Sequence, residues 1–222
     1  MEHQIGWFEW EDSTWDPWLD LEPGETGNRL NDGRCDPAGR FWVGSMYERA
    51  SERRFTGMLH RIEPSGEFSV VRSEIGVSNG LAFSPSGETM YFADTLQETV
   101  WRYHYDPSTG ECSNERVLTD FSALPGRPDG ACVDADGCYW VACVYGWAVA
   151  RLTPKGAVDR IVELPVEAPT MPAFGGSSLE TLFVTSIGEA GSNPSAPDQD
   201  EAGHLLALDI GATGLPEPRF GG

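Results

Sequence analysis

The stretch NDGRCDPAGRFWVGSM, residues 31–46, decides the fold because its plan returns three times further along the chain. Each copy has a short polar segment with Gly or Pro, then an apolar strand, a Gly turn and a second strand rich in large side chains. The first three copies begin about 50 residues apart, a period typical of a four-stranded blade of a β-propeller. The four copies begin at Asn31-Asp32-Gly33, Ser78-Asn79-Gly80, Pro128-Asp129-Gly130 and Pro169-Thr170-Met171-Pro172.

A second hairpin with alternating apolar residues and a Gly turn follows each copy, in residues 57–71, 99–118, 148–164 and 204–220. Residues 5–23 resemble one more outer hairpin, with strands at 5–8 and 15–19, and no inner hairpin precedes it. No window has the apolar spacing of an amphipathic helix. We therefore expect an all-β chain, residues 1–222, that forms a single propeller domain with about four and a half blades.

The charge balance narrows the choice of partners. The chain has 35 acidic and 15 basic residues, a formal net charge of −20. Nucleic acids and anionic membranes need a basic surface, so neither is expected as a partner. No apolar run approaches the ~18 residues that span a bilayer, and the N-terminus is acidic and aromatic rather than a secretory signal. We expect a cytoplasmic protein, and the sequence leaves its oligomeric state open.

Polar side chains at the starts of the inner strands are the candidate site. In a propeller these strands run along a central channel, so Asn31, Asp32, Asn79 and Asp129 are expected to face one another at its mouth. Their oxygens suit a hard divalent cation. The alternative is that Asn-Gly and Asp-Gly are only turn formers, and spacing alone does not decide between the two interpretations.

These motifs carry a family resemblance. Residues 29–46, Ser78-Asn79-Gly80 with residues 81–84, and Pro128-Asp129-Gly130 with residues 140–142 resemble the SMP-30/gluconolactonase/LRE family, which includes regucalcin and bacterial sugar lactonases. The similarity covers residues 5–220. It implies a six-bladed β-propeller that hydrolyses sugar lactones to aldonic acids with one divalent metal ion, Ca²⁺, Zn²⁺, Mn²⁺ or Mg²⁺.

The resemblance also assigns roles to residues. Asn79 matches a metal ligand, and Asp129 matches a residue that is both metal ligand and general base. Arg29 and Asn31 match residues that contact the substrate. Glu48 matches an acidic substrate contact, the alternative being an exposed loop carboxylate.

One departure bears on activity. The family's third metal ligand is a Glu in a Gly-Glu-x-Pro-x-Trp segment, and this sequence has none. The first blade and the inner half of the second are therefore expected to be missing, and Glu2, Glu9 and Glu11 cannot be assumed to replace that ligand. Two alternatives to an active lactonase stay open: an impaired or non-enzymatic propeller that binds a metal or ligand, and an enzyme of the strictosidine-synthase or arylesterase type.

Overall fold

The computed structural model describes residues 2–24, 27–188 and 199–221, and these residues are mostly β-strand. A short 3-10 helix, η1 (Ala50–Glu52), follows β4. The strands are β1 (Gln4–Glu9), β2 (Thr14–Asp20), β3 (Asn28–Cys35), β4 (Phe41–Tyr47), β5 (Gly57–Ile62), β6 (Phe68–Ile75), β7 (Ser78–Phe83), β8 (Thr89–Asp94), β9 (Thr99–Asp106), β10 (Glu111–Thr119), β11 (Arg127–Val133), β12 (Tyr139–Val144), β13 (Ala148–Leu152), β14 (Val158–Glu163), β15 (Pro169–Gly175), β16 (Thr181–Ser186) and β17 (Leu206–Asp209).

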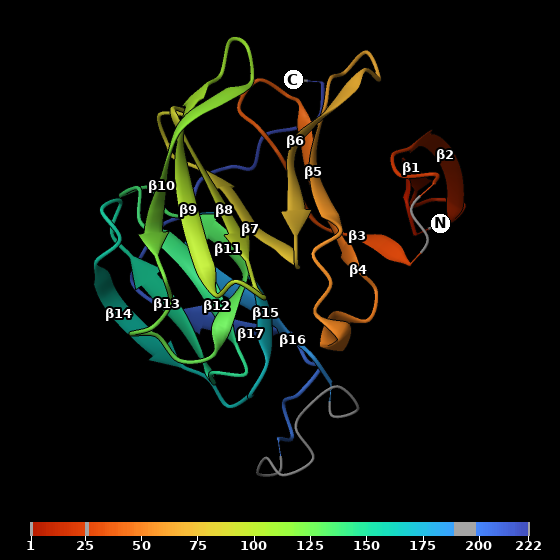
Figure 1. Cartoon of the computed structure of the whole chain (residues 1–222). Helices are drawn as coiled ribbons and strands as arrows, with labels where there is room; N and C mark the ends of the chain where they lie inside the picture. The colour runs from red at the N-terminus through yellow and green to blue at the C-terminus, as the bar shows by residue number, and fades with distance from the viewer. Residues whose placement is uncertain (1, 25–26, 189–198, 222) are drawn as a thin grey trace.

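The strands form antiparallel sheets in sequence order: the hairpin β1-β2, then β3 to β6, β7 to β10, β11 to β14, and β15 to β17. Strand β7 contacts both β3 and β11, and β11 also contacts β15, so the first strand of each sheet lies innermost. Figure 1 shows the four larger sheets side by side as propeller blades, with β1 and β2 set apart at one side. This arrangement confirms the prediction of an all-β propeller with four blades and a further half.

Apolar side chains fill the space between neighbouring blades. One cluster joins Trp42 and Leu59 of the first blade to Phe92 and Tyr105 of the second. Similar clusters join the second blade to the third and the third to the fourth. The hairpin β1-β2 packs through Ile5, Trp18 and Leu19 on a smaller cluster of the first blade. Each blade is thus stabilised mainly by burial against its neighbours.

A buried carboxylate recurs at the same place in two blades. Asp134 accepts from the indole Nε1 of Trp140 at 2.8 Å and from the Nε of Arg151 at 2.8 Å. Asp36 accepts from the indole Nε1 of Trp42 at 3.1 Å. Both carboxylates also accept from backbone N–H groups of the turn that follows. The spacing D-x-x-G-x-x-W therefore ties a hairpin turn to the buried indole of the next strand.

The prediction of an outer hairpin at residues 204–220 is wrong for the second strand of that hairpin. Only β17 forms a strand there, and the chain after it leaves the sheet. Gly214 donates its N–H to the carbonyl of Leu179, and the carbonyl of Thr213 accepts from the N–H of Ala135 in the third blade. Pro216 and Pro218 follow, and proline has no N–H to donate to a sheet.

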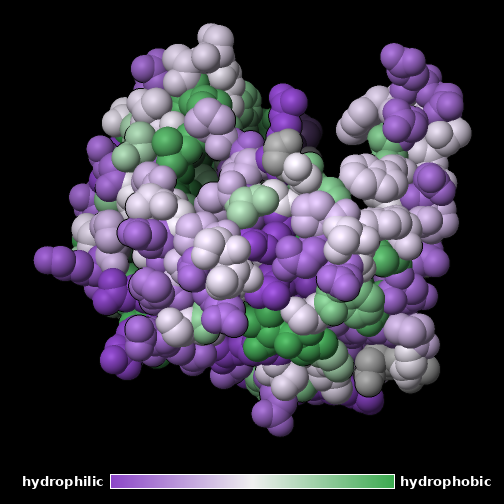
Figure 2. All heavy atoms as spheres, turned by 90° about the horizontal axis from the view of Figure 1, so that it is seen from above, coloured by the Kyte–Doolittle hydropathy of each residue, from purple (hydrophilic) through white to green (hydrophobic). Residues whose placement is uncertain are grey.

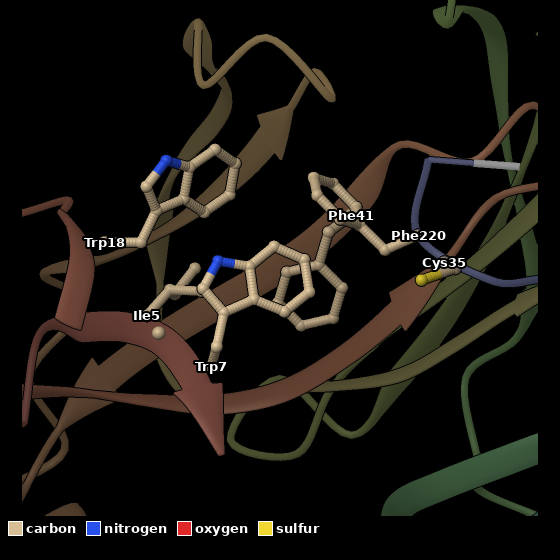
Figure 3. Close-up of a pocket in the computed structure, with 7 residues that line it drawn as sticks. Ile5, Trp7, Trp18, Cys35, Phe41 and Phe220 are labelled. Carbon is tan, nitrogen blue, oxygen red and sulfur yellow. The ribbon is translucent and has the colours of Figure 1, made fainter. Parts of the chain in front are cut away.

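The end of the chain instead reaches the N-terminal hairpin. Glu217 forms an ion pair with Arg34 of β3. The ring of Phe220 packs against both Trp7 and Trp18, with ring centroids 5.8 and 5.5 Å away. Figure 3 shows these three aromatic side chains around an apolar pocket that Cys35 also lines. The C-terminal segment thus connects the last blade to the hairpin β1-β2.

The surface agrees with the acidic composition. From above, most of the visible face is polar, with apolar side chains gathered in a few places, and a notch separates the body from the lobe where Figure 1 places β1 and β2 (Figure 2). In the described part of the chain, no helix has the length and apolar character needed to cross a membrane.

Candidate functional site

A β-bulge interrupts the pairing of each inner strand at the polar segments that the sequence singles out. A bulge places two residues opposite one and turns a side chain away from the regular alternation. Asn31 and Asp129 lie within the bulges of their strands, whereas Asn79 pairs with Ala93 and directly precedes the bulge of β7. The shifts in register fall between Leu30 and Gly33 in β3, between Asn79 and Ala82 in β7, and between Pro128 and Ala131 in β11.

A chain of hydrogen bonds connects these strands across three blades. Arg29 Nη1 donates to Asn31 Oδ1 at 2.9 Å, and Asn31 Nδ2 donates to Asn79 Oδ1 at 3.2 Å. Asn79 Nδ2 then donates to Thr95 Oγ1 at 2.8 Å, and Thr95 Oγ1 donates to the carbonyl of Pro128 at 2.7 Å. The orientation of Asn79 is therefore fixed from both sides.

These side chains line one cavity of about 520 Å³, a size usual for small-molecule sites. Asp129 is the only acidic residue among its described lining residues. Three arginines, Arg29, Arg53 and Arg127, also line it. The remaining lining residues are Asn31, Met46, Ala50, Ser51, Val77, Asn79, Thr95, Leu96, Val144, Tyr145 and Ile187.

Asp129 holds its proton more tightly than an ordinary carboxyl group. Burial, together with the nearby carboxylate of Asp32, raises its pKa from 3.8 to about 7. Hydrogen bonds from the Gly130 N–H and the Asn79 amide act in the opposite direction. A carboxyl group with a pKa near neutrality suits general base catalysis, because it can take up and release a proton at physiological pH.

Two residues from the sequence analysis lie away from the cavity lining. Asp32 turns toward β7 and accepts from the N–H of Leu81 at 2.9 Å. Burial raises its pKa as well. Glu48 is exposed, its N–H donates to the carbonyl of Gly27, and it does not line the cavity. The exposed-carboxylate interpretation of Glu48 matches this position.

Thr95, Arg53 and Arg127 are among the lining residues that the sequence analysis did not single out. Thr95 directly follows the end of β8, and Arg127 lies two residues before Asp129, so the blade repeat could have pointed to both. Arg53 lies in the connection between β4 and β5, where the repeat gives no register. Only the folded chain brings it to the cavity.

The donor set fits a hard divalent cation in its chemistry. Asp129 offers a carboxylate and Asn79 an amide oxygen, and such ions prefer oxygen ligands. A cation beside Asp129 would also offset the burial and the repulsion from Asp32 that raise its pKa. The described residues hold no group of three or more His, Cys, Asp or Glu side chains that could bind a metal ion. The fit thus rests on two side chains.

Comparison with known proteins places this chain in a family. The SMP-30/gluconolactonase/LRE-like region matches residues 1–188. A 6-deoxy-6-sulfogluconolactonase of Pseudomonas putida is 40% identical over 200 residues, which are 90% of this chain and 68% of that protein. A pentonolactonase of Haloferax volcanii is 36% identical, over 88% of this chain and 67% of its own.

Solved structures agree. A luciferin-regenerating enzyme superposes with a TM-score of 0.91 at 31% identity, over 99% of this chain and 75% of its own. A calcium-binding regucalcin of Agrobacterium tumefaciens gives a TM-score of 0.91 at 29% identity, over 99% of this chain and 74% of its own. With its propeller, its inner-strand motifs and these matches, the chain belongs to the SMP-30/gluconolactonase/LRE-like family.

Proposed function

We propose that the protein hydrolyses a sugar lactone to the corresponding aldonic acid. Asp129 carries the proposal: it is a carboxyl group with a pKa near 7 in a cavity lined by amide and guanidinium donors. Two relatives bear the names of sugar lactonases, one acting on a sulfonated gluconolactone and one on pentonolactones. These names support the reaction class and place sulfonated lactones among the substrates to test.

In the proposed reaction Asp129 takes a proton from a water molecule, whose oxygen attacks the lactone carbonyl carbon. The bond between that carbon and the ring oxygen then breaks. The ring oxygen receives the proton and becomes a hydroxyl group of the open aldonic acid. Arg29 and Asn31, already joined at 2.9 Å, are placed to orient the oxygens of the sugar.

Asn79 and Asp129 are the side chains that would hold a divalent metal ion. When bound, such an ion supplies Lewis-acid polarisation of the lactone carbonyl. Asn31 and Thr95 contribute by holding Asn79 from either side, which keeps its amide oxygen in place.

A second candidate is a propeller that binds a metal ion or a ligand without turnover. The observation in its favour is the donor set of two side chains, which offers weaker restraint on a metal than three or four ligands. The two candidates differ in whether lactone is consumed.

The test measures the rate of proton release from glucono-1,5-lactone and subtracts the spontaneous rate. The protein is first freed of metal with a chelator and is then assayed with added Mn²⁺, Zn²⁺ or Ca²⁺. We expect metal-dependent hydrolysis that Asp129→Asn lowers by about a thousandfold. The matched control is Asp200→Asn, because Asp200 is exposed and outside the cavity. Metal binding without hydrolysis would favour the second candidate, and an equal rate in Asp129→Asn would refute the role of this carboxyl group.

A further inference from the structure

The cavity is basic in a protein that is strongly acidic. Lys and Arg number 15 against 35 Asp and Glu, yet three arginines and a single acid line this cavity among the described residues. Neutral lactones and a divalent cation give no reason for such an excess of positive charge. The charge distribution instead points to an anion in the ligand.

Arg53 is held at the cavity by backbone contacts rather than by an acid. It adopts a left-handed conformation with φ of 49° at the end of η1, which is uncommon for a residue other than glycine. Its Nη2 donates to the carbonyl of Leu96 at 3.0 Å. Its neighbours Arg49 and Arg54 both pair with Glu52, whereas Arg53 pairs with no carboxylate in the described part of the chain.

Arg127 reaches the same turn from the other side. Its Nε forms an ion pair with Oε1 of Glu98 at 3.1 Å, which leaves its two terminal nitrogens without an acid in the described structure. Leu96 and Glu98 lie two residues apart in the connection between β8 and β9. The guanidinium groups of Arg53, from the first blade, and Arg127, from the third, are thus anchored on one short turn of the second blade.

Arg29 completes the group of three arginines. Its Nη1 donates to the carbonyl of Leu30 at 3.1 Å and to Asn31 Oδ1 at 2.9 Å, both neutral acceptors. No carboxylate forms an ion pair with it in the described structure, and its charge acts on Asp129. Arg53 and Arg127 are anchored on the turn after β8. Asp129 and the two arginines anchored on that turn line the same cavity.

We propose that the substrate is a sugar lactone with a tetrahedral anionic group, a sulfonate or a phosphate ester, remote from the lactone carbonyl, and that Arg53 and Arg127 bind this group. The proposal rests on the proposed lactonase function. Guanidinium groups recognise such oxyanions through paired N–H donors.

The test compares kcat/KM for gluconolactone, 6-deoxy-6-sulfogluconolactone and 6-phosphogluconolactone at low ionic strength. We expect the better of the two anionic lactones to be preferred over gluconolactone by about thirtyfold. Arg53→Gln and Arg127→Gln should each lower that preference about tenfold, and Arg53→Lys should restore part of it because the charge returns. A higher rate with the sulfonate or with the phosphate ester identifies which anion the site takes.

Arg54→Gln is the matched control, because Arg54 is adjacent to Arg53, pairs with Glu52 and does not line the cavity. The Arg54→Gln variant should prefer the anionic lactone over gluconolactone by the same factor as the unmodified protein. Hydrolysis of gluconolactone as fast as of both anionic lactones, or a preference unaffected by both Gln variants, would overturn the proposal and leave the lactonase function standing.

If no lactone is hydrolysed, the proposed function fails and the anion site is tested by calorimetry. Sulfogluconate and phosphogluconate are then compared with gluconate. Tighter binding of an anionic acid that both Arg53→Gln and Arg127→Gln weaken would support the site. Equal binding of the three acids would overturn it.

Discussion

Replacement of Asp129 by Asn should stabilise the metal-free protein at pH 8 while it removes the proposed base. Burial, with a further contribution from Asp32, raises the pKa of Asp129 from 3.8 to about 7. At pH 8 the folded protein must therefore hold Asp129 as a carboxylate anion in surroundings that disfavour its negative charge. Asn has nearly the same shape, carries no charge and retains an oxygen that can accept from the Gly130 N–H.

The size of the effect follows from proton linkage. Each pH unit of difference between the folded and unfolded pKa is equivalent to about 1.4 kcal/mol of folding free energy. A pKa raised from 3.8 to about 7 thus corresponds to about 4 kcal/mol. Because the folded state holds a proton that the unfolded chain releases, this stability is lost as pH rises from about 4 to 7. The advantage of Asp129→Asn should be near zero at pH 4 and fully present at pH 8.

Urea unfolding in a chelator, at pH values from 4 to 8, measures this difference. Comparison of the variant with the unmodified protein at each pH cancels the titration of distant groups. Asp200→Asn, an exposed change, should show no such pH dependence. Addition of a divalent cation at pH 8 should then stabilise the unmodified protein and leave Asp129→Asn nearly unaffected. A free-energy difference that stays constant from pH 4 to 8 would refute the reasoning.

Two further predictions concern buried carboxylates outside the cavity. Burial alone would raise the pKa of Glu22, but hydrogen bonds from His60, whose Nε2 lies 2.8 Å from Oε1, and from other side chains lower it overall. Glu22→Gln should therefore lower the free energy of unfolding by about 3 kcal/mol at pH 7. This loss should shrink as pH falls below 4.5, the ordinary pKa of Glu22. Denaturant unfolding at pH 7 and at a pH below 4.5 measures both effects. Asp134→Ala should destabilise the protein by about 4 kcal/mol, because it leaves the buried indole of Trp140 without an acceptor and the buried guanidinium of Arg151 without its partner. The same change made in a Trp140→Phe background should cost less, which a double-mutant cycle measures.

The repeat made most of the propeller predictable. Turns with Gly and alternating apolar residues are local signals. The N-terminal hairpin, with strands expected at 5–8 and 15–19, is therefore found as β1 and β2, and the four inner hairpins are found as β3-β4, β7-β8, β11-β12 and β15-β16. The exception is residues 210–220. Their contacts to Ala135, Leu179 and Arg34 lie in three other parts of the chain, and no local pattern encodes them.

The site was predictable only where it follows the repeat. Asp32, Asn79 and Asp129 are equivalent in the repeat, so the period brings Asn79 and Asp129 to the same end of the channel. Asp32 instead accepts from the N–H of Leu81, and the cavity is lined by Asn31, one residue before the equivalent position. Arg53 comes from a connection between strands whose path depends on tertiary packing. Glu22 and His60 are 38 residues apart and become partners only when the N-terminal hairpin packs on the first blade.

The structure also answers why the site residues precede glycine, the point on which the sequence left two interpretations open. A Cβ at Gly80, which has φ of 62°, would lie 2.3 Å from the hydroxyl oxygen of Tyr139, and a Cβ at Gly130 would lie 2.3 Å from Met171 Sδ. Glycine is needed there because a side chain of the next blade comes too close for a Cβ: Tyr139 of β12 at Gly80 and Met171 of β15 at Gly130. These glycines lie at bulges within strands and not in hairpin turns, and the same bulges aim the preceding Asn79 and Asp129 at the cavity. The packing of neighbouring blades and the placement of Asn79 and Asp129 therefore depend on the same glycines. A Gly80→Ala change should disturb both together.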